Sequence, residues 1–220
     1  MVETRNPASE SLMRKLEFNL KETKDVKWPE EKGGEMRHVG IWVRDVPEPE
    51  GPWVVTSAGP SFLAPTAEWD GDEPYLIPSG RDDVIVTPYR NTPRDVKEIM
   101  ELCNAPGVAK WSHGRPFPFT EESAQKRLAP MIPKQAETVA LMRDGHAPKV
   151  NPFSVIRERA TGRYIGDLAL LEDYHSGRWE LAYALHPDFH SRGIATAVMR
   201  AILAWGKEHL EARKIECVSV

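Results

Sequence analysis

A run of six residues, His190-Ser191-Arg192-Gly193-Ile194-Ala195, has the composition of a turn that binds an anion at the start of a helix. About four backbone N–H groups have no partner at a helix start, and the helix dipole places partial positive charge there. Gly193 removes a side chain where the backbone would approach the anion, while Ala195 keeps the next turn small. Arg192 adds a cation and Thr196 adds a hydroxyl. The run therefore predicts a phosphate-binding turn.

A simpler interpretation is that Gly193 only closes a tight turn and that Arg192 lies in solvent. Short glycine motifs carry little information without their structural context. Here the context favours the anion site, because a period-two apolar run at 179–185 precedes the turn and predicts a strand. After the turn, apolar residues recur at helical spacing, namely Ile194, Val198, Ala201, Ile202 and Trp205.

Two other kinds of site are not expected at this turn. His186 and His190 are four residues apart, but Pro187 lies between them and both precede the predicted helix, so we expect no metal site. A nucleotide-binding P-loop would place a Lys next to a Ser or Thr after the glycine turn, and the sequence has no such pair there.

The composition excludes several classes of protein. A formal net charge of −4 argues against a protein that coats nucleic acid. No apolar run approaches the roughly 18 residues of a membrane helix, and no secretory signal peptide is recognisable. Cys103 and Cys217 are too few for a disulfide framework and are expected to be small buried hydrophobes. We therefore expect a cytoplasmic location, with the nucleus not excluded. We expect neither nucleic acid nor a membrane as a partner.

Residues 1–80 are expected to form a partly ordered extension, because this part of the chain is rich in proline and turn residues. Within it, leucines at helical spacing predict a short amphipathic helix over residues 11–23. Short strands are predicted at 39–43 and 53–55.

From residue 81 onward the pattern is that of a regular α+β domain. A strand at 83–89 precedes a helix that Thr92 can cap and that runs to about Leu102, and a second helix begins after the Thr120 cap. Short turns between period-two runs predict an antiparallel meander, with strands at 153–157, 164–170 and 179–185. The last strand, 215–220, follows a helical crossover and is expected to lie parallel to 179–185.

The segment from about Asp83 to Val220 resembles the GNAT acyltransferases and, within them, the RimJ/RimL-like N-acetyltransferases. The coenzyme signature of the family is Gln/Arg-x-x-Gly-x-Gly/Ala, and residues 190–195 match it except that His190 replaces the usual first residue. Further stretches are similar to the same group, namely 104–111, 161–166 and 179–187.

The resemblance implies the acyl-CoA N-acyltransferase fold, a mixed and mostly antiparallel sheet flanked by helices. Strands 179–185 and 215–220 would splay apart and admit the pantetheine arm of acetyl-CoA. The coenzyme-binding residues that it implies are Ala184, Leu185, His186, His190, Ser191, Arg192, Gly193, Ile194, Ala195 and Thr196. The implied reaction is direct transfer of an acetyl group to a primary amine, at a protein N-terminus or on a small molecule, without a metal.

Glu180 is the candidate catalytic base, because it stands where many members of the family hold a carboxylate and because an incoming ammonium must lose a proton. Partial burial would raise the pKa of this carboxyl to a useful value. Alternatively Glu180 is a solvated or structural residue, and a water relay from His186 or Asp167 replaces it. The aromatic residues Trp111, Phe117 and Phe119 line the acceptor pocket or pack between helices.

In the family the last strand is followed by a loop with Asn and Ser, a helix that touches the coenzyme, and two more strands. The predicted domain, 81–220, lacks them, which would leave strand 215–220 as an exposed edge. A second hypothesis is therefore a non-catalytic module that binds CoA or a partner.

Overall fold

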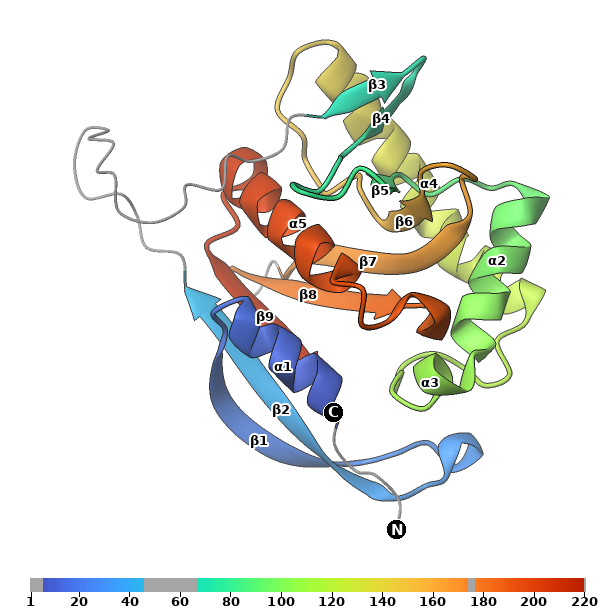
Figure 1. Ribbon diagram of the computed structural model, residues 1–220, viewed down its shortest axis with the longest axis vertical. Helices are drawn as coiled ribbons and strands as arrows, with labels where there is room; N and C mark the ends of the chain where they lie inside the picture. The colour runs from blue at the N-terminus through green and yellow to red at the C-terminus, as the bar shows by residue number, and fades with distance from the viewer. Residues whose placement is uncertain (1–5, 46–66, 174–176, 220) are drawn as a thin grey trace.

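The computed structural model describes residues 6–45, 67–173 and 177–219 (Figure 1). Seven strands form one sheet in the order β1-β2-β9-β8-β7-β6-β5. All neighbouring strands are antiparallel except β8 and β9, which are parallel. The strands of this sheet are β1 (Asn19–Lys27), β2 (Met36–Asp45), β5 (Val84–Thr87), β6 (Val155–Glu158), β7 (Tyr164–Asp173), β8 (Arg178–Leu185) and β9 (Lys214–Ser219).

Helices cover both faces of the sheet (Figure 1). One face packs against α1 (Pro7–Lys15) and α5 (Ile194–Leu210), and the other against α2 (Pro93–Asn104), α3 (Pro106–Ala109) and α4 (Glu121–Arg143). A small hairpin of β3 (Glu68–Asp70) and β4 (Glu73–Tyr75) forms a second sheet, and Leu76, directly after β4, bridges to Val86 of β5. Within the described ranges, none of these helices combines the length and the apolar character needed to cross a membrane.

The predicted mixed α+β fold, its meander and its parallel last strand are confirmed. Strands β6, β7 and β8 pair in sequence order, and Gly166 of β7 lies opposite Leu185 of β8. The helix caps are also confirmed, because the Thr92 side chain accepts from the backbone N–H of Asp95 and the Thr120 side chain accepts from that of Ser123. Both hydroxyls satisfy N–H groups that the helices leave unpaired.

Helix α5 packs along the sheet through the predicted apolar stripe. Ile194, Val198, Ile202 and Trp205 are buried, and the Trp205 ring meets Phe153 edge to face at 5.1 Å between centroids. This burial fixes the direction of α5, so that its first turn lies at the end of the sheet where β8 ends.

The helix predicted over residues 11–23 is wrong in its extent. The observed α1 ends at Lys15, Glu17 adopts a left-handed backbone (φ 62°), and β1 begins at Asn19. Leu12 and Leu16 are buried as the helical spacing requires, but Leu20 is 48% exposed on β1. Pairing of β1 with β2 thus outweighs the helical periodicity of the leucines.

Strand β2 contains the predicted strand 39–43, whereas the predicted strand 53–55 lies outside the described residues. Six residues of β2, Gly40–Asp45, pair with Ser219–Lys214 of β9. The expectation that the last strand would be an exposed edge is therefore wrong, since the N-terminal segment covers it. Residues 7–45 place a helix and two strands beside β9, and their core residue Trp42 is only 3% exposed.

Candidate functional site

Helix α5 begins without a side-chain cap. Its N-cap is Gly193, in a left-handed conformation (φ 76°) that side chains disfavour. By contrast, α1, α2 and α4 are capped by the side chains of Asn6, Thr92 and Thr120. The first N–H groups of α5, around Ala195 and Thr196, are thus left for another acceptor, as an anion-binding helix start requires.

The turn before α5 is held by two polar contacts. Nε2 of His190 lies 2.8 Å from the carbonyl oxygen of Leu185, at the end of β8. Arg81 donates through Nη1 to the carbonyl of Arg192, and Arg81 is itself fixed by a bidentate pair with Asp83, at 2.7 and 2.6 Å. Arg81 therefore fixes the backbone of the predicted anion-binding turn. Sequence reasoning missed it, because it lies 111 residues from its partner.

Cations gather beside this turn. The guanidinium groups of Arg192 and Arg163 both lie over the ring of Phe189, at 5.1 and 5.6 Å from its centroid. The helix dipole and these two cations act in the same direction, so the turn favours an anion.

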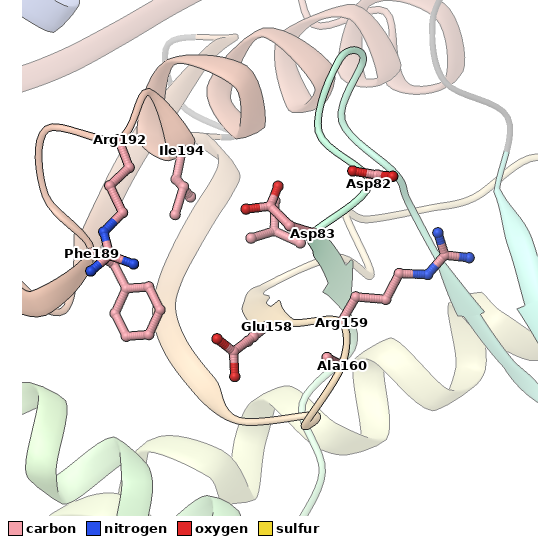
Figure 2. A pocket seen from close by; sticks show the side chains of 9 residues that line it. Asp82, Asp83, Glu158, Arg159, Ala160, Phe189, Arg192 and Ile194 are labelled. Carbon is pink, nitrogen blue, oxygen red and sulfur yellow. The ribbon is translucent and has the colours of Figure 1, made fainter.

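A pocket of about 310 Å³ adjoins the first turn of α5 (Figure 2). Its lining includes Arg192 and Ile194 but also the carboxylates of Asp82, Asp83 and Glu158. A hydrogen bond from Arg81 lowers the pKa of Asp83, so this carboxylate stays ionised at neutral pH. Carboxylates repel phosphate, and the exposed backbone at the start of α5 is the better anion site than this pocket.

Strands β8 and β9 diverge beside the turn. They pair only where Trp179–Leu181 lies opposite Ile215–Cys217, although β8 continues to Leu185. The backbone N–H of His186 donates to Ile165 of β7 at 2.8 Å. Because backbone groups alternate in direction along a strand, those of Tyr183 and Leu185 face the opening.

This alternation corrects the predicted backbone edge, Ala184 to His186. Ala184 and His186 direct their backbone groups to β7, and Leu185 is the predicted residue whose groups face the opening. Tyr183 was missed, although strand alternation applied to the meander register would have identified it. Tyr183 also contacts α1, since its hydroxyl donates to Ser9 Oγ at 3.3 Å, and burial raises the pKa of this hydroxyl to about 12.

The side chain of Glu180 lies on the face of β8 opposite that of Tyr183. Ala182 and Ala184 share this face with Glu180. The expectation of partial burial is wrong, because the side chain is exposed. Its cross-strand neighbour Leu171 is 45% exposed, so this part of the face is uncovered in the described ranges. On the other side Glu180 pairs in register with Glu216, which forms an ion pair with Arg178.

Asp167 and His186, the alternatives to Glu180, already have partners. Both carboxylate oxygens of Asp167 are engaged, by Arg115 at 2.8 Å and Arg127 at 2.9 Å. Burial alone would raise the pKa of Asp167, but these two cations outweigh it and hold the pKa below its ordinary value. The Nδ1 atom of His186 accepts from the backbone N–H of Asp188 at 3.3 Å. Neither group is placed as a free base.

The three aromatic candidates differ in their surroundings. Phe119 is buried in the core between α2 and α4, which is packing. Phe117 is 41% exposed. Trp111 stacks with Lys110 and with Arg37, at 4.4 and 5.3 Å from its ring centroid.

The structure brings the predicted coenzyme residues to one end of the sheet, around the opening of β8 and the start of α5. Half-buried side chains there include Ala195 and Thr196, whereas His190, Ser191, Arg192 and Gly193 are exposed. In the part of the chain that the structure describes, no cluster of three or more His, Cys, Asp or Glu side chains is arranged to hold a metal ion.

Comparisons with known proteins identify the family. Residues 84–220 match the model of the acetyltransferase (GNAT) domain. A search of curated proteins gives no match.

Three solved structures are similar at low identity. Ribosomal-protein-S5-alanine acetyltransferase from Vibrio fischeri is 16% identical, over 62% of this chain and 70% of that chain, with a TM-score of 0.41. A GNAT-family acetyltransferase from Bordetella pertussis is 17% identical, over 65% and 76% of the two chains, with a TM-score of 0.40. A GCN5-related N-acetyltransferase from Sphaerobacter thermophilus is 14% identical, over 98% of this chain and 48% of that chain, with a TM-score of 0.39. Because the matched domain spans more than half of the sequence, the chain belongs to the GNAT acetyltransferase family.

Proposed function

We propose that this protein is an N-acetyltransferase that moves the acetyl group of acetyl-CoA to a primary amine. One observation carries the proposal: the uncapped start of α5, at Gly193, lies beside the point where β8 and β9 diverge. An anion site and an open strand edge in that arrangement suit a ligand with a diphosphate and an extended arm that carries amides.

The coenzyme is proposed to bind across the start of α5 and along the opening between β8 and β9. Its diphosphate accepts hydrogen bonds from the backbone N–H groups of Ile194, Ala195 and Thr196, with Arg192 as the adjacent cation. Its pantetheine amides pair with the outward backbone groups of Tyr183 and Leu185. The His190 side chain already occupies the carbonyl of Leu185, which leaves the N–H of Leu185 and the backbone of Tyr183 for the arm.

The acceptor amine is proposed to approach from the face of the sheet that carries Glu180. This exposed carboxylate takes a proton from the ammonium, directly or through a water, and the neutral amine attacks the thioester carbonyl. A C–N bond forms and the C–S bond breaks, so that CoA leaves as a thiolate and takes a proton from solvent, while the acylated nitrogen loses its remaining extra proton to solvent and becomes the neutral amide. No covalent intermediate with the protein is needed.

The acceptor is either a protein N-terminus or a small-molecule amine. The resemblance of residues 161–166 and 179–187 to the RimJ/RimL-like group suggests a protein N-terminus, whereas relatives of this sort also modify small amines. A cytoplasmic location is proposed with it.

A non-catalytic CoA-binding module is the second candidate. The exposure of Glu180 favours it, because the side chain lacks the burial that is typical of a catalytic carboxylate in a cleft.

Residues 6–45 are proposed to belong to the same functional unit rather than to a separate extension. Strand β2 pairs with β9, Trp42 is buried in the main core, and Ser9 of α1 contacts Tyr183 at the opening. The domain boundary near residue 80 stays a prediction.

Calorimetric titration with acetyl-CoA and with CoA tests binding, and a thiol-release assay with peptide and small-amine acceptors tests transfer. We expect Glu180→Gln to reduce kcat by about 100-fold or more without changing the affinity for acetyl-CoA. Glu216→Gln is the matched control, because it removes the neighbouring carboxylate of the same face and should leave kcat within about threefold of wild type, the usual effect of a surface change. Binding of acetyl-CoA without any thiol release would favour the module.

A further inference from the structure

A single buried carboxylate holds two guanidinium groups on the face of the sheet that carries Glu180. Oδ1 of Asp167 accepts from Arg115 at 2.8 Å, and Oδ2 lies 2.9 Å from Nη2 of Arg127. Arg115 comes from the loop after α3 and Arg127 from α4, so two separate segments direct a cation to the same point.

The charges of this cluster do not balance. Its other ionisable members are Tyr89, Tyr164 and Cys103, and burial raises the pKa of each, so all three are neutral at pH 7. Two cations and one anion leave one positive charge. A partly buried charge is costly unless an anion accompanies it, so the cluster favours a second anion.

The two arginines remain accessible to such an anion. The side chain of Asp167 is 1% exposed, but those of Arg115 and Arg127 are 20% and 25% exposed. In the described ranges, the contacts of Arg127 with Asp167 and with the Tyr89 hydroxyl both use Nη2. The Nε and Nη1 groups of Arg127 are therefore available to a ligand, and each can donate one charge-assisted hydrogen bond to a carboxylate from its own side of the guanidinium.

The register of the sheet places this cluster near the proposed reaction. Asp167 of β7 lies directly opposite Ala184 of β8, and Leu171 lies opposite Glu180. Residues that lie opposite each other point to the same face, so the arginines and Glu180 share the side from which the amine approaches. Four residues of strand separate Ala184 from Glu180, about 13 Å along the strand, and the side chain of Glu180 can cover part of that length.

We infer that Arg115 and Arg127, held by Asp167, bind a carboxylate of the acceptor, and that the acceptor is an amino acid or a similarly small carboxylated amine. The inference rests on the proposed acetyl transfer for the identity of the reacting group, but the binding of the carboxylate can be measured without it.

The test compares each standard amino acid with its α-carboxamide, which keeps the amine and lacks the negative charge. Calorimetric titration of the full-length protein should show that at least one acid binds about tenfold or more tightly than its amide. In the thiol-release assay the same acid should have the higher kcat/KM by a similar factor.

Arg127→Gln should abolish the preference for the acid while leaving the affinity for the amide unchanged. This variant keeps the Arg115–Asp167 pair, and its thermal midpoint reports whether it folds. Arg143→Gln is the matched control, since Arg143 lies on the same helix but pairs with Asp72 away from the cluster, and it should keep the preference.

If no acid binds more tightly than its amide, or if Arg127→Gln weakens acid and amide equally, the inference is overturned. Acetyl-CoA is titrated separately, so a failure of the proposed function appears as absent coenzyme binding or absent thiol release, and is distinguished from a failure of acid selection.

Discussion

Replacing Gly193 by Glu adds a negative charge at the proposed diphosphate site. The residue is the N-cap of α5, with φ 76°, and a Cβ there would have Arg81 Nη1 as its nearest neighbour, at 3.8 Å. The Cβ of the new side chain therefore makes no contact closer than an ordinary van der Waals contact. Its effects are electrostatic and conformational, and they can be separated.

The expected magnitude has two parts. A left-handed backbone with a side chain costs about 1–2 kcal/mol, which reduces the stability of the fold whether or not a ligand is present. A carboxylate about 5 Å from one phosphate charge costs about 3 kcal/mol at an effective dielectric constant near 20. Since about 1.4 kcal/mol is a tenfold change, the affinity for acetyl-CoA should fall by about 100-fold or more.

Calorimetric titration with acetyl-CoA at a fixed salt concentration measures this loss. Gly145→Glu is the matched control, because Gly145 has nearly the same backbone angle (φ 78°) and open surroundings but follows the end of α4. The control should lose similar stability and keep its affinity. Equal affinities of Gly193→Glu and wild type would refute the assignment of the diphosphate to this turn.

Three further predictions concern stability and are measured by urea denaturation. Arg157 donates to both carboxylate oxygens of the buried Asp95, at 2.8 and 2.6 Å. Arg157→Met leaves this carboxylate without a partner and should lower the free energy of unfolding by about 3–5 kcal/mol. A loss below about 1 kcal/mol would contradict this. Asp167→Asn should be less stable than wild type at pH 7. Because the pKa of Asp167 is lowered in the folded state, the difference should shrink as the pH falls below about 4, and a constant difference would be inconsistent with the ion pairs. Trp42→Ala should lower the free energy of unfolding by about 3–5 kcal/mol, and the protein should still unfold in one cooperative transition. A separate transition at lower urea concentration would show that residues 6–45 unfold independently of the core.

The sequence predicts well those features that depend on neighbouring residues. Helix caps at Thr92 and Thr120, the meander and the stripe of α5 all follow from local spacing, and all are present. The uncapped helix start at Gly193 follows from the same local rules, because glycine offers no side chain to cap with.

Features that join distant segments could not be predicted in this way. The contact of Arg81 with the turn before α5, and the pairing of β2 with β9, bring together residues from opposite parts of the chain. The Asp167 cluster likewise depends on how the loop after α3 and helix α4 pack on the sheet. The exposure of Glu180 could not be predicted for the same reason, because it depends on which distant elements cover β8. The period-two pattern predicts only the face of the strand on which the side chain lies.

The central claim is that main-chain amides at the first turn of α5 hold the diphosphate of the coenzyme. Amide chemical shifts of ¹⁵N-labelled protein, recorded during titration with CoA, test it most directly. The account predicts the largest shifts at Ile194, Ala195 and Thr196, with smaller ones at Tyr183 and Leu185. Saturable binding of CoA with unchanged amide resonances at the start of α5 would contradict it.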